Sequence, residues 1–349
     1  MNSQQPGPLI SVGMPAYNAE RYIGAAIESI LGQTFQDWEL VIVNDGSTDT
    51  TLERIRSYKD HRIKCFSQDN SGPAVGYNRA LAESRGHYFA LLNADDVCHP
   101  DRLEYQFQSY STGNRRILFS TPDFIDSEGK PMSGDHFLTG RFRADSYTPA
   151  QTLEQFFFHG NFLCTPTLFA ERDVLLEAGP FNPALFNLND FELWIRLVKK
   201  YPLCPDPRPV IQYRIHSRNL SAPPREAADL RRAVRFHNEN YLVMRNFFDG
   251  VSSALFKEAF ARRLIRSTCE TDLERECEQA FLYLKVLDRR VQLIGMEKLA
   301  RLLASPDGET VLNESYGFTP FSFANGPLAD VDIENLIPKG LLLDDRAQA

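Results

Sequence analysis

Short apolar runs alternate with amphipathic segments between residue 9 and about residue 121. Four runs have the apolar character of strands, at 9–14, 39–44, 63–68 and 88–92. Three segments with helical periodicity follow them in turn, near 23–31, 48–59 and 73–84. This succession of strands and helices is typical of a largely parallel sheet flanked by helices. The sequence therefore predicts the α/β class.

The first predicted helix carries a regular apolar stripe. Apolar residues recur there at i, i+3, i+4, i+7 and i+8, at Ile23, Ala26, Ile27, Ile30 and Leu31. Asn18 precedes the stripe and is available as the helix cap. The strand at 39–44 shows no alternation, because residues 40–43 are all apolar, which is typical of a strand covered on both faces. We therefore expect helices on both sides of the sheet.

The pattern changes after residue 121. Residues 122–150 are rich in Asp, Ser, Gly and Pro, which predicts a long loop or a small hairpin. Regular periodicity then predicts further elements near 152–159 (helix), 165–170 (strand), 189–200 (helix) and 210–215 (strand). Pro223-Pro224 marks a boundary. We expect an α/β domain over 1–224, a helical domain over 225–304, and an extended or partly disordered tail over 305–349.

Composition and charge narrow the class of protein. The chain has 349 residues, of which 43% are hydrophobic and 24% charged, a composition that supports a globular core and excludes a fully disordered chain. Its 46 acidic and 38 basic residues give a net charge of −8, so the basic footprint of a nucleic-acid-binding protein is missing. No apolar run approaches the ~20 residues of a membrane-spanning helix.

Cysteine use and the amino terminus predict the compartment. The start MNSQQPGP has neither the basic nor the apolar region of a secretory signal. The six cysteines are scattered without a C-x-x-C pair, which argues against both a zinc site and a disulfide framework. We therefore expect a cytoplasmic protein, with peripheral contact at the inner face of the membrane left open.

Polar segments follow three of the predicted strands. In parallel α/β sheets, ligands bind beyond the carboxyl ends of the strands, where loops and helix N-termini converge. Carboxylates at that edge can hold a hard divalent cation that bridges to a phosphate. The three segments are Pro15-Ala16-Tyr17-Asn18, Asn44-Asp45-Gly46-Ser47-Thr48-Asp49 and Asn93-Ala94-Asp95-Asp96.

Each acidic candidate also has an ordinary structural explanation. Asp95 or Asp96 is either a metal ligand or the cap of a helix that begins near Pro100. Asp45 lies in Asn-Asp-Gly-Ser, which fits a ligand position and a turn equally well. Asp190, at the start of a predicted helix, is either a helix cap or a general base. No Gly-x-Gly-x-x-Gly follows a strand and no Gly-Lys-Ser occurs, which disfavours dinucleotide-dependent and P-loop enzymes.

Five segments occur in an order that is typical of one enzyme family. They are SVGMPAYNAERYI, DWELVIVNDGSTDTT, NSGPAVGYNRALAESRGHYFALLNADDVCHPDRL, GPFNPALFNLNDFELWIRL and YRIHSRNLS. Together they resemble the family 2 glycosyltransferases, which have the nucleotide-diphospho-sugar transferase (GT-A) fold. The resemblance covers roughly residues 9–222. It implies a GT-A-type, mostly parallel sheet flanked by helices, here followed by a C-terminal helical extension.

The resemblance implies a donor-binding role for one group of residues. Asp45 would bond to the nucleotide base, and Arg79 would lie near the base or the phosphates, with a solvated helix charge as the alternative. The nucleotide pocket would be lined by Pro15, Ala16, Tyr17 and Asn18. The predicted partner is therefore a nucleotide-diphospho-sugar donor.

A second group would carry the reaction. Asp95 would ligate Mg²⁺ or Mn²⁺, with Asp96 beside it near the ribose or the metal. His216 would lie near the donor phosphates or the metal, with a surface histidine as the alternative. Asp190 would be the catalytic base. The family usually has aspartate where this chain has Asn93, whose amide oxygen still accepts hydrogen bonds but brings no charge for the metal.

These roles imply an inverting glycosyltransferase that moves a sugar from a nucleotide-diphosphate donor to an acceptor hydroxyl, in surface polysaccharide or glycoconjugate assembly. The position before the base is commonly acidic in the family and is Asn189 here, which leaves room for an altered donor. One alternative is a catalytically degenerate GT-A-fold protein that only binds nucleotide sugars. A sugar-nucleotide pyrophosphorylase is disfavoured, because it needs a Gly-rich, Arg-containing loop where this chain has residues 15–18.

The helical region leaves the acceptor and the assembly state open. The acceptor would be a saccharide or a lipid-linked molecule. Arg262, Arg263 and Arg266 would face anionic lipid, or be solvated on a helical cap or a dimer surface, which the nearby acidic residues 270–278 favour. A homo-oligomer stays open, and no nucleic-acid partner is expected.

Overall fold

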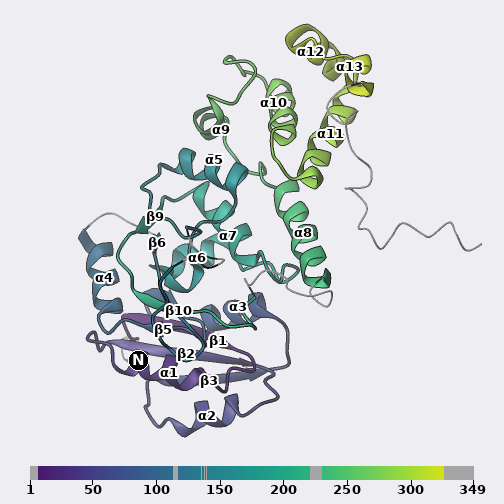
Figure 1. Cartoon of the computed structure of the whole chain (residues 1–349). Helices are drawn as coiled ribbons and strands as arrows, with labels where there is room; N and C mark the ends of the chain where they lie inside the picture. The colour runs from purple at the N-terminus through teal and green to yellow at the C-terminus, as the bar shows by residue number, and fades with distance from the viewer. Residues whose placement is uncertain are drawn as a thin grey trace, which may run out of the picture. The chain divides into compact units, whose positions relative to one another are not determined.

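The computed structural model describes residues 7–112, 117–134, 136, 138, 140–220 and 230–325 (Figure 1). The chain forms two compact units, Met1–Glu239 and Asn240–Ala349. The division falls within helix α8 (Leu230–Arg245). The predicted boundary after residue 224 lies outside the described residues.

The first unit is built on a seven-stranded sheet with the order β3-β2-β1-β4-β8-β6-β9. Only β8 runs antiparallel to its neighbours β4 and β6, and the other pairings are parallel. The predicted mostly parallel sheet is therefore confirmed. A smaller sheet has the order β5-β10-β7. The strands are β1 (Ile10–Ala16), β2 (Trp38–Asp45), β3 (Ile63–Gln68), β4 (Tyr88–Leu91), β5 (Val97–Cys98), β6 (Ile117–Ser120), β7 (Asp123–Ile125), β8 (Phe169–Glu171), β9 (Leu203–Asp206) and β10 (Ile211–Arg214).

Helices flank this sheet, and their apolar stripes pack on it. All eight residues of β2 are buried, as a strand covered on both faces requires. Four members of the predicted stripe of α1, Ile23, Ala26, Ile27 and Ile30, are buried. The helical segments are α1 (Ile23–Leu31), α2 (Thr51–Ser57), α3 (Pro73–Glu83), α4 (Arg102–Thr112), α5 (Pro149–His159), η1 (Thr165–Thr167), α6 (Arg172–Ala178), α7 (Asn189–Val198) and the start of α8.

The predicted cap of α1 is wrong. The N-cap position is Tyr22, which makes no side-chain capping bond. Asn18 instead has a φ of 47° and accepts hydrogen bonds from the N–H and hydroxyl of Thr48. Asn18 tolerates this left-handed conformation better than most residues, so it joins the loops after β1 and β2 rather than starting a helix.

The region predicted as a long loop or a small hairpin contains both. β7 pairs with β10 in the smaller sheet. The Asp126 N–H donates to the Lys130 carbonyl, and Ile125 bridges antiparallel to Pro131, which closes a short hairpin. Irregular chain follows until α5, apart from residues 135, 137 and 139, which lie outside the described part.

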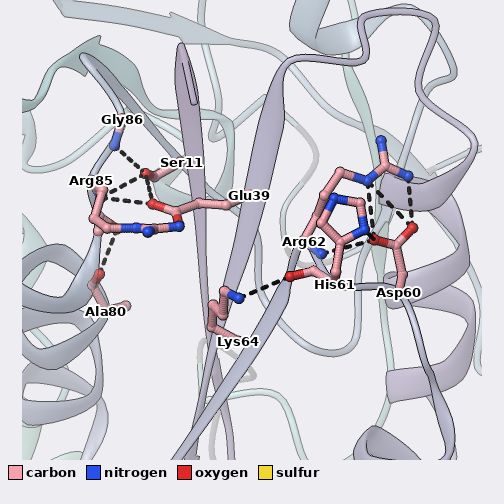
Figure 2. A network of polar contacts seen from close by, with 10 residues as sticks. Ser11, Glu39, Asp60, His61, Arg62, Lys64, Ala80, Arg85 and Gly86 are labelled. Carbon is pink, nitrogen blue, oxygen red and sulfur yellow. Dashed lines mark hydrogen bonds and ion pairs between the residues drawn. The ribbon is translucent and has the colours of Figure 1, made fainter. Parts of the chain in front are cut away.

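Buried polar contacts secure the amino edge of the sheet, meaning the starts of β1, β2 and β4 (Figure 2). Glu39 is 2% exposed and accepts from the Ser11 hydroxyl (2.7 Å) and from the Arg85 guanidinium (2.9 Å). The Gly86 N–H donates to Ser11, and a Cβ at Gly86 would lie 2.5 Å from the Ser11 nitrogen. Only glycine therefore allows the chain to enter β4 at this point. Beside this network, Arg62 pairs with Asp60, and that guanidinium holds the pKa of Asp60 at about 2.

The second unit is helical, as predicted for the C-terminal extension. After the end of α8 it comprises α9 (Ser253–Phe260), α10 (Asp272–Leu284), α11 (Arg289–Leu303), α12 (Pro306–Tyr316) and α13 (Pro320–Ala324). A small core joins α10, α11 and α12 through Cys277, Ala280, Leu299, Leu302 and Leu312. In the described part of the chain, no helix combines the length and apolarity that crossing a membrane requires.

The expectation of an extended tail from residue 305 needs correction for its first part. Residues 306–316 and 320–324 are helical. Pro306 and Pro320 stand at the first turn of α12 and α13, after the capping residues Ser305 and Thr319. Proline is favourable there, because its missing N–H has no helical partner in any case. Residues 326–349 lie outside the described residues.

Candidate functional site

Asp45 organises the loop that leads into α3. It ends β2, is 4% exposed, and its Oδ1 accepts from the Gln68 side chain (2.7 Å) and the Ser71 N–H (3.0 Å). Its Oδ2 accepts from the Gly72 N–H (2.9 Å). Asp45 is therefore more than a turn residue of its own loop, since it binds the next loop along the carboxyl edge. We use this name for the ends of β1, β2, β3 and β4.

Arg79 lies on the Asp45 side of this edge. Its guanidinium donates to the Ser67 carbonyl (2.8 Å) and to the Gln68 side-chain oxygen (3.3 Å). Gln68 in turn donates to Asp45. Arg79 is thus held by the chain at the end of β3, and its ion pair with Glu83 is longer, at 3.8 Å.

The segment after β1 closes the same edge. The Asn18 N–H donates to the Ser47 hydroxyl (3.0 Å), which fixes this segment against the loop that follows Asp45. A Cβ at Gly76 would lie 2.9 Å from the Cβ of Pro15, so α3 approaches this strand end closely. Ala16 is buried, whereas Tyr17 is 52% exposed. The four predicted pocket residues therefore lie beside Asp45, with the Tyr17 ring open to solvent.

Asp95 and His216 come together from distant parts of the chain. His216 Nε2 lies 3.0 Å from Asp95 Oδ2. The Arg218 N–H donates to His216 Nδ1 (3.1 Å), so the neutral ring carries its proton on Nε2 and donates it to Asp95. The ring also stacks on Tyr22, at 5.0 Å between centroids. His216 is therefore not the free surface histidine considered as an alternative.

Asp96 faces the protein interior. It is 1% exposed, and its carboxylate accepts from the Arg214 N–H (2.9 Å) and the Asn93 amide (3.3 Å). Burial, followed by the nearby charge of Asp95, raises the pKa of Asp96 well above its usual range. Neither Asp95 nor Asp96 caps the helix that follows, since both side chains are engaged elsewhere.

Asn93 bridges two neighbours that an aspartate would treat differently. Its Oδ1 accepts from the Tyr77 hydroxyl (3.0 Å) and its amide N–H donates to Asp96. An aspartate would present a second negative oxygen to Asp96 in place of this donor. Asparagine at position 93 therefore avoids a like-charge contact with Asp96 at the end of β4.

Asp190 lies in the first turn of α7 but does not occupy its capping position. The N-cap residue is Leu188. Asp190 Oδ2 accepts from the Thr165 hydroxyl, and Oδ1 accepts from the Phe191 N–H (2.6 Å). Burial raises the pKa of Asp190, against the hydrogen bonds and the charge of Arg141, which lower it.

The structure brings Asp190 to the same place as Asp95 and Asp96. Burial raises the pKa of the Tyr77 hydroxyl, and the charges of Asp190, Asp95 and Asp96 each raise it further. Cys164 also lies near Asp96 and Asp190. Burial and the charges of these two acids raise the pKa of its thiol. Interactions between charges fall off with distance, so all three carboxylates lie near Tyr77.

Sequence reasoning missed several residues of this region. Tyr77 and Arg214 lie within two of the segments that resemble the family, NSGPAVGYNRALAE and YRIHSRNLS. The resemblance could therefore have pointed to them. The Arg214 guanidinium donates to the Asp95 carbonyl (2.8 Å) and lies over the Tyr22 ring. Cys164 and Arg141 carried no sequence signal, because only the fold brings them near Asp190.

Three buried amide oxygens near these loops have no hydrogen-bond partner among the described residues. They belong to Asn44, Asn187 and Asn189. Asn44 precedes Asp45, and the other two flank the capping residue of α7. Buried acceptors without a partner are uncommon in folded proteins and fit a polar ligand or ordered water.

Comparisons with known proteins identify the family of the chain. Residues 11–177 match the pattern of Glycosyl transferase family 2. A glycosyltransferase of unknown role from Rickettsia felis is 29% identical over 252 residues, which are 69% of this chain but only 38% of that protein. TuaG of Bacillus subtilis, a glycosyltransferase assigned to teichuronic acid biosynthesis, is 31% identical over 197 residues, 55% of this chain and 73% of TuaG.

Solved structures share the fold at low sequence identity. TarS 1–349 of S. aureus in complex with UDP-GlcNAc has a TM-score of 0.56 and 19% identity, over 88% of this chain and 91% of that chain. A mannosyltransferase of Pyrobaculum calidifontis in complex with GDP-Man and Mn²⁺ has a TM-score of 0.53 and 18% identity, over 90% and 82%. With the matching sequence pattern and the relatives above, these similarities establish that the chain belongs to glycosyl transferase family 2.

Proposed function

We propose that this protein transfers a sugar from a nucleotide-diphosphate donor to an acceptor hydroxyl with inversion at the anomeric carbon. One observation carries the proposal. The half-buried Tyr77 donates its hydroxyl proton to Asn93 (3.0 Å) and feels the charges of Asp190, Asp95 and Asp96, which supports one shared region for the predicted base and the predicted phosphate-side acids. Two acids with different surroundings in one region suit a reaction that needs one proton acceptor and one centre of charge neutralisation.

The donor nucleotide would lie along the part of the carboxyl edge that Asp45 organises. Residues 15–18, Asp45 and Arg79 meet there through direct hydrogen bonds between their loops. The unpartnered oxygen of Asn44 supplies a further acceptor for a base or a ribose hydroxyl. The complexes of TarS with UDP-GlcNAc and of the mannosyltransferase with GDP-Man support a nucleotide-sugar donor without deciding between the two nucleotides.

Asp95 and His216 fit a divalent cation as protein ligands. They offer one carboxylate oxygen and one imidazole nitrogen, a donor set that Mn²⁺ or Mg²⁺ can complete with donor phosphate oxygens and water. No cluster of three His, Cys, Asp or Glu groups forms a metal cage among the described residues, so substrate oxygens are needed. When bound, the cation would neutralise charge on the departing diphosphate. The Mn²⁺ in the mannosyltransferase complex supports this assignment.

Ligation by His216 Nε2 has a structural requirement. That nitrogen donates its proton to Asp95 in this structure. To bind a cation, Nε2 must lose that proton. If the ring stays neutral, the proton moves to Nδ1, which then no longer accepts from the Arg218 N–H. Cation binding should therefore rearrange the turn at residues 216–218.

Asp190 would act as the general base. Its carboxylate is oriented by Thr165 and by the Phe191 N–H, and its raised pKa makes it a better proton acceptor than an exposed aspartate. In the transfer step the acceptor O–H proton goes to Asp190, and the acceptor oxygen bonds to the anomeric carbon. The bond from that carbon to the diphosphate oxygen breaks with its electron pair. A single displacement of this kind inverts the configuration.

The acceptor and the cellular role belong to the same proposal. TuaG is assigned to teichuronic acid biosynthesis, which supports a saccharide or lipid-linked acceptor in surface polysaccharide assembly. Peripheral membrane contact, a cytoplasmic location and a homo-oligomer remain predictions from the sequence. The exposed residue Arg141, whose charge acts on Asp190, is a candidate contact for the acceptor.

The test is release of nucleoside diphosphate from a panel of UDP-Glc, UDP-GlcNAc, UDP-Gal and GDP-Man with Mn²⁺, first with water as the acceptor. We expect one donor to be hydrolysed by the wild type and about 10²-fold or more slowly by Asp190→Asn. Asp60→Asn is the matched control, because it removes a carboxylate that pairs with Arg62 at the start of β3.

Two results would contradict the proposal. Near wild-type turnover by Asp190→Asn with intact UDP or GDP binding would remove the base assignment. Binding of UDP or GDP without hydrolysis of any donor, and without transfer to added saccharides, would instead favour the degenerate nucleotide-sugar binder.

A further inference from the structure

A buried glutamate from α8 holds the turn that leads into α7. Glu239 is 4% exposed, and its carboxylate accepts from three consecutive backbone N–H groups. The donors are Phe186 (2.9 Å), Asn187 (2.7 Å) and Leu188 (2.9 Å). The Asn187 side-chain amide adds a longer contact at 3.4 Å. Glu239 thus binds the entry of α7 from a different helix.

The electrostatics of this contact are favourable. In the described part of the chain, the Glu239 carboxylate accepts its hydrogen bonds from amide N–H groups. Leu188 is the N-cap residue of α7, and the N-terminus of a helix carries partial positive charge. Charge-assisted bonds from backbone N–H groups to a carboxylate are among the stronger hydrogen bonds in proteins. The turn is therefore firmly fixed at residues 186–188.

This turn carries Asp190. Asp190 follows Leu188 by two residues and accepts from the Phe191 N–H within the first turn of α7. The Asn189 side chain donates to the Phe186 carbonyl (3.1 Å), which closes the same turn. A shift at residues 186–188 would therefore move the Asp190 backbone.

The turn also contacts the loop that Asp45 holds. A Cβ at Gly72 would lie 3.4 Å from the Phe186 ring, so this ring packs against the loop whose Gly72 N–H donates to Asp45. Arg235 of α8 lies over the Phe186 ring at 4.1 Å from its centroid. Arg235 and Glu239 are four residues apart and share one face of α8. One helix face thus fixes the turn between the base and the donor-side loop.

We propose that Glu239 is a positioning residue that sets the place of the Asp190 carboxylate relative to the donor. This inference rests on the proposed function, since it assigns Glu239 a role in the reaction of that same site. Replacement by glutamine would present an NH₂ group to N–H donors and leave at least one of them without an acceptor. The turn would then relax, and Asp190 would lose its alignment with the acceptor hydroxyl.

The test compares Glu239→Gln with Glu239→Asp and with a matched control, Glu278→Gln. Glu278 is also buried and accepts from two backbone N–H groups, Ile265 (2.9 Å) and Arg266 (2.8 Å), but it belongs to the second unit. For each variant we would measure kcat for nucleotide-sugar hydrolysis with Mn²⁺, the Kd values of UDP and GDP, and amide hydrogen exchange over residues 186–191.

We expect Glu239→Gln to lower kcat by at least about 10-fold, since a misplacement of about 1 Å can cost 10²-fold. The nucleotide Kd should stay within about 3-fold, because Asp45 keeps its own hydrogen bonds. Amides 186–191 should exchange faster, Glu239→Asp should recover part of kcat, and Glu278→Gln should leave kcat unchanged.

Unchanged kcat in folded Glu239→Gln would overturn the proposal, and so would a parallel loss of kcat and nucleotide binding. If Glu239→Gln does not fold, Glu239→Asp carries the same comparison. Failure of the proposed function looks different, because the wild type itself would then release no nucleoside diphosphate. In that case unchanged exchange at 186–191 would still overturn the positioning of this turn by Glu239, and faster exchange would support it.

Discussion

The two edges of the large sheet hold their buried carboxylates in different ways. At the amino edge, Glu39 is matched by the Arg85 guanidinium and the Ser11 hydroxyl. At the carboxyl edge, Asp45 is held by neutral N–H groups and Asp190 by a hydroxyl and an N–H. Neutral donors orient a carboxylate without cancelling its charge. The Asp45 and Asp190 carboxylates therefore keep negative charge that a cationic or proton-bearing ligand can balance.

The difference between the two edges distinguishes acidic residues that stabilise the fold from acidic residues that suit a function. A carboxylate that pairs with a guanidinium has its charge balanced within the protein. Asp96 and Asp190 instead have raised pKa values because they are buried, and Asp96 also because Asp95 is close. Groups of this kind cost stability in the charged form and are found preferentially at functional sites. Substitution of Glu39 at the amino edge should therefore change the free energy of unfolding, and substitution of Asp95 at the carboxyl edge should change activity.

The largest effect is expected from Asp95→Asn. Removing this carboxylate takes away the charged ligand for the cation, so nucleoside-diphosphate release should fall by about 10²-fold or more. The gain in Tm that Mn²⁺ and UDP or GDP give together should also disappear, which a thermal-shift titration measures. Wild-type activity that persists in EDTA would contradict the metal role of Asp95.

Glu39→Gln should show the opposite behaviour. The buried carboxylate accepts from Ser11 and from the Arg85 side chain and N–H, and glutamine replaces one of its oxygens with a donor. We expect the free energy of unfolding to fall by about 1–3 kcal/mol. Urea denaturation measures this loss, and kcat measured well below Tm should stay at the wild-type value. A selective loss of kcat would break the distinction between the two edges.

Asn93→Asp should add a like charge at the carboxyl edge. The new carboxylate would face Asp96, whose pKa is already raised, and both pKa values would rise in the folded state. An acid whose pKa is raised by folding stabilises the folded state less as pH rises through its folded-state pKa. The variant should therefore be less stable than the wild type at neutral pH by about 1 kcal/mol. Acidification or Mn²⁺ should reverse the loss. Equal Tm values for variant and wild type from pH 5 to 8 would show that the two side chains do not interact.

The smallest effect is a gain in stability from Asp190→Asn. The folded-state pKa of Asp190 is raised, so its stabilising contribution is present below the unfolded pKa and is lost as pH rises through the folded value. Asparagine avoids this loss but keeps only one oxygen to accept from Thr165 or the Phe191 N–H, so the net gain is small. The free energy of unfolding at neutral pH should therefore equal or exceed that of the wild type by less than about 1 kcal/mol. The difference should vanish at acidic pH, and a lower Tm at neutral pH would argue that charged Asp190 stabilises the fold.

The parallel half of the fold could be predicted from periodicity. The bounds of β3 match the predicted strand, and the stripe of α1 is buried as expected. β6 and β9 carried no prediction, because β9 contains Pro205, which argues against a strand, and the short apolar run of β6 shows no alternation. The helices after residue 305 were missed, because prolines that usually interrupt structure stand at helix starts.

The candidate site divides in the same way. Asp45, Asp95 and Asp96 could be placed from the sequence, because polar residues directly after strands of a parallel sheet share one edge. The neighbours of Asp190 could not, since Thr165 and Cys164 approach it, and Glu239 holds the turn before it, through the folding of distant segments. Asn18 was assigned to the wrong structure because the same side chain suits a helix cap and a left-handed loop position.

We propose that Asp95 and Asp190 act on opposite sides of one bound donor. The most direct measurement is a crystal structure of Asp190→Asn with Mn²⁺ and the hydrolysed nucleotide sugar from the panel. We predict that the diphosphate and the cation contact Asp95, and that residue 190 faces the anomeric carbon from the side opposite the diphosphate. A donor bound away from Asp95, or residue 190 on the same side as the leaving diphosphate, would contradict the account.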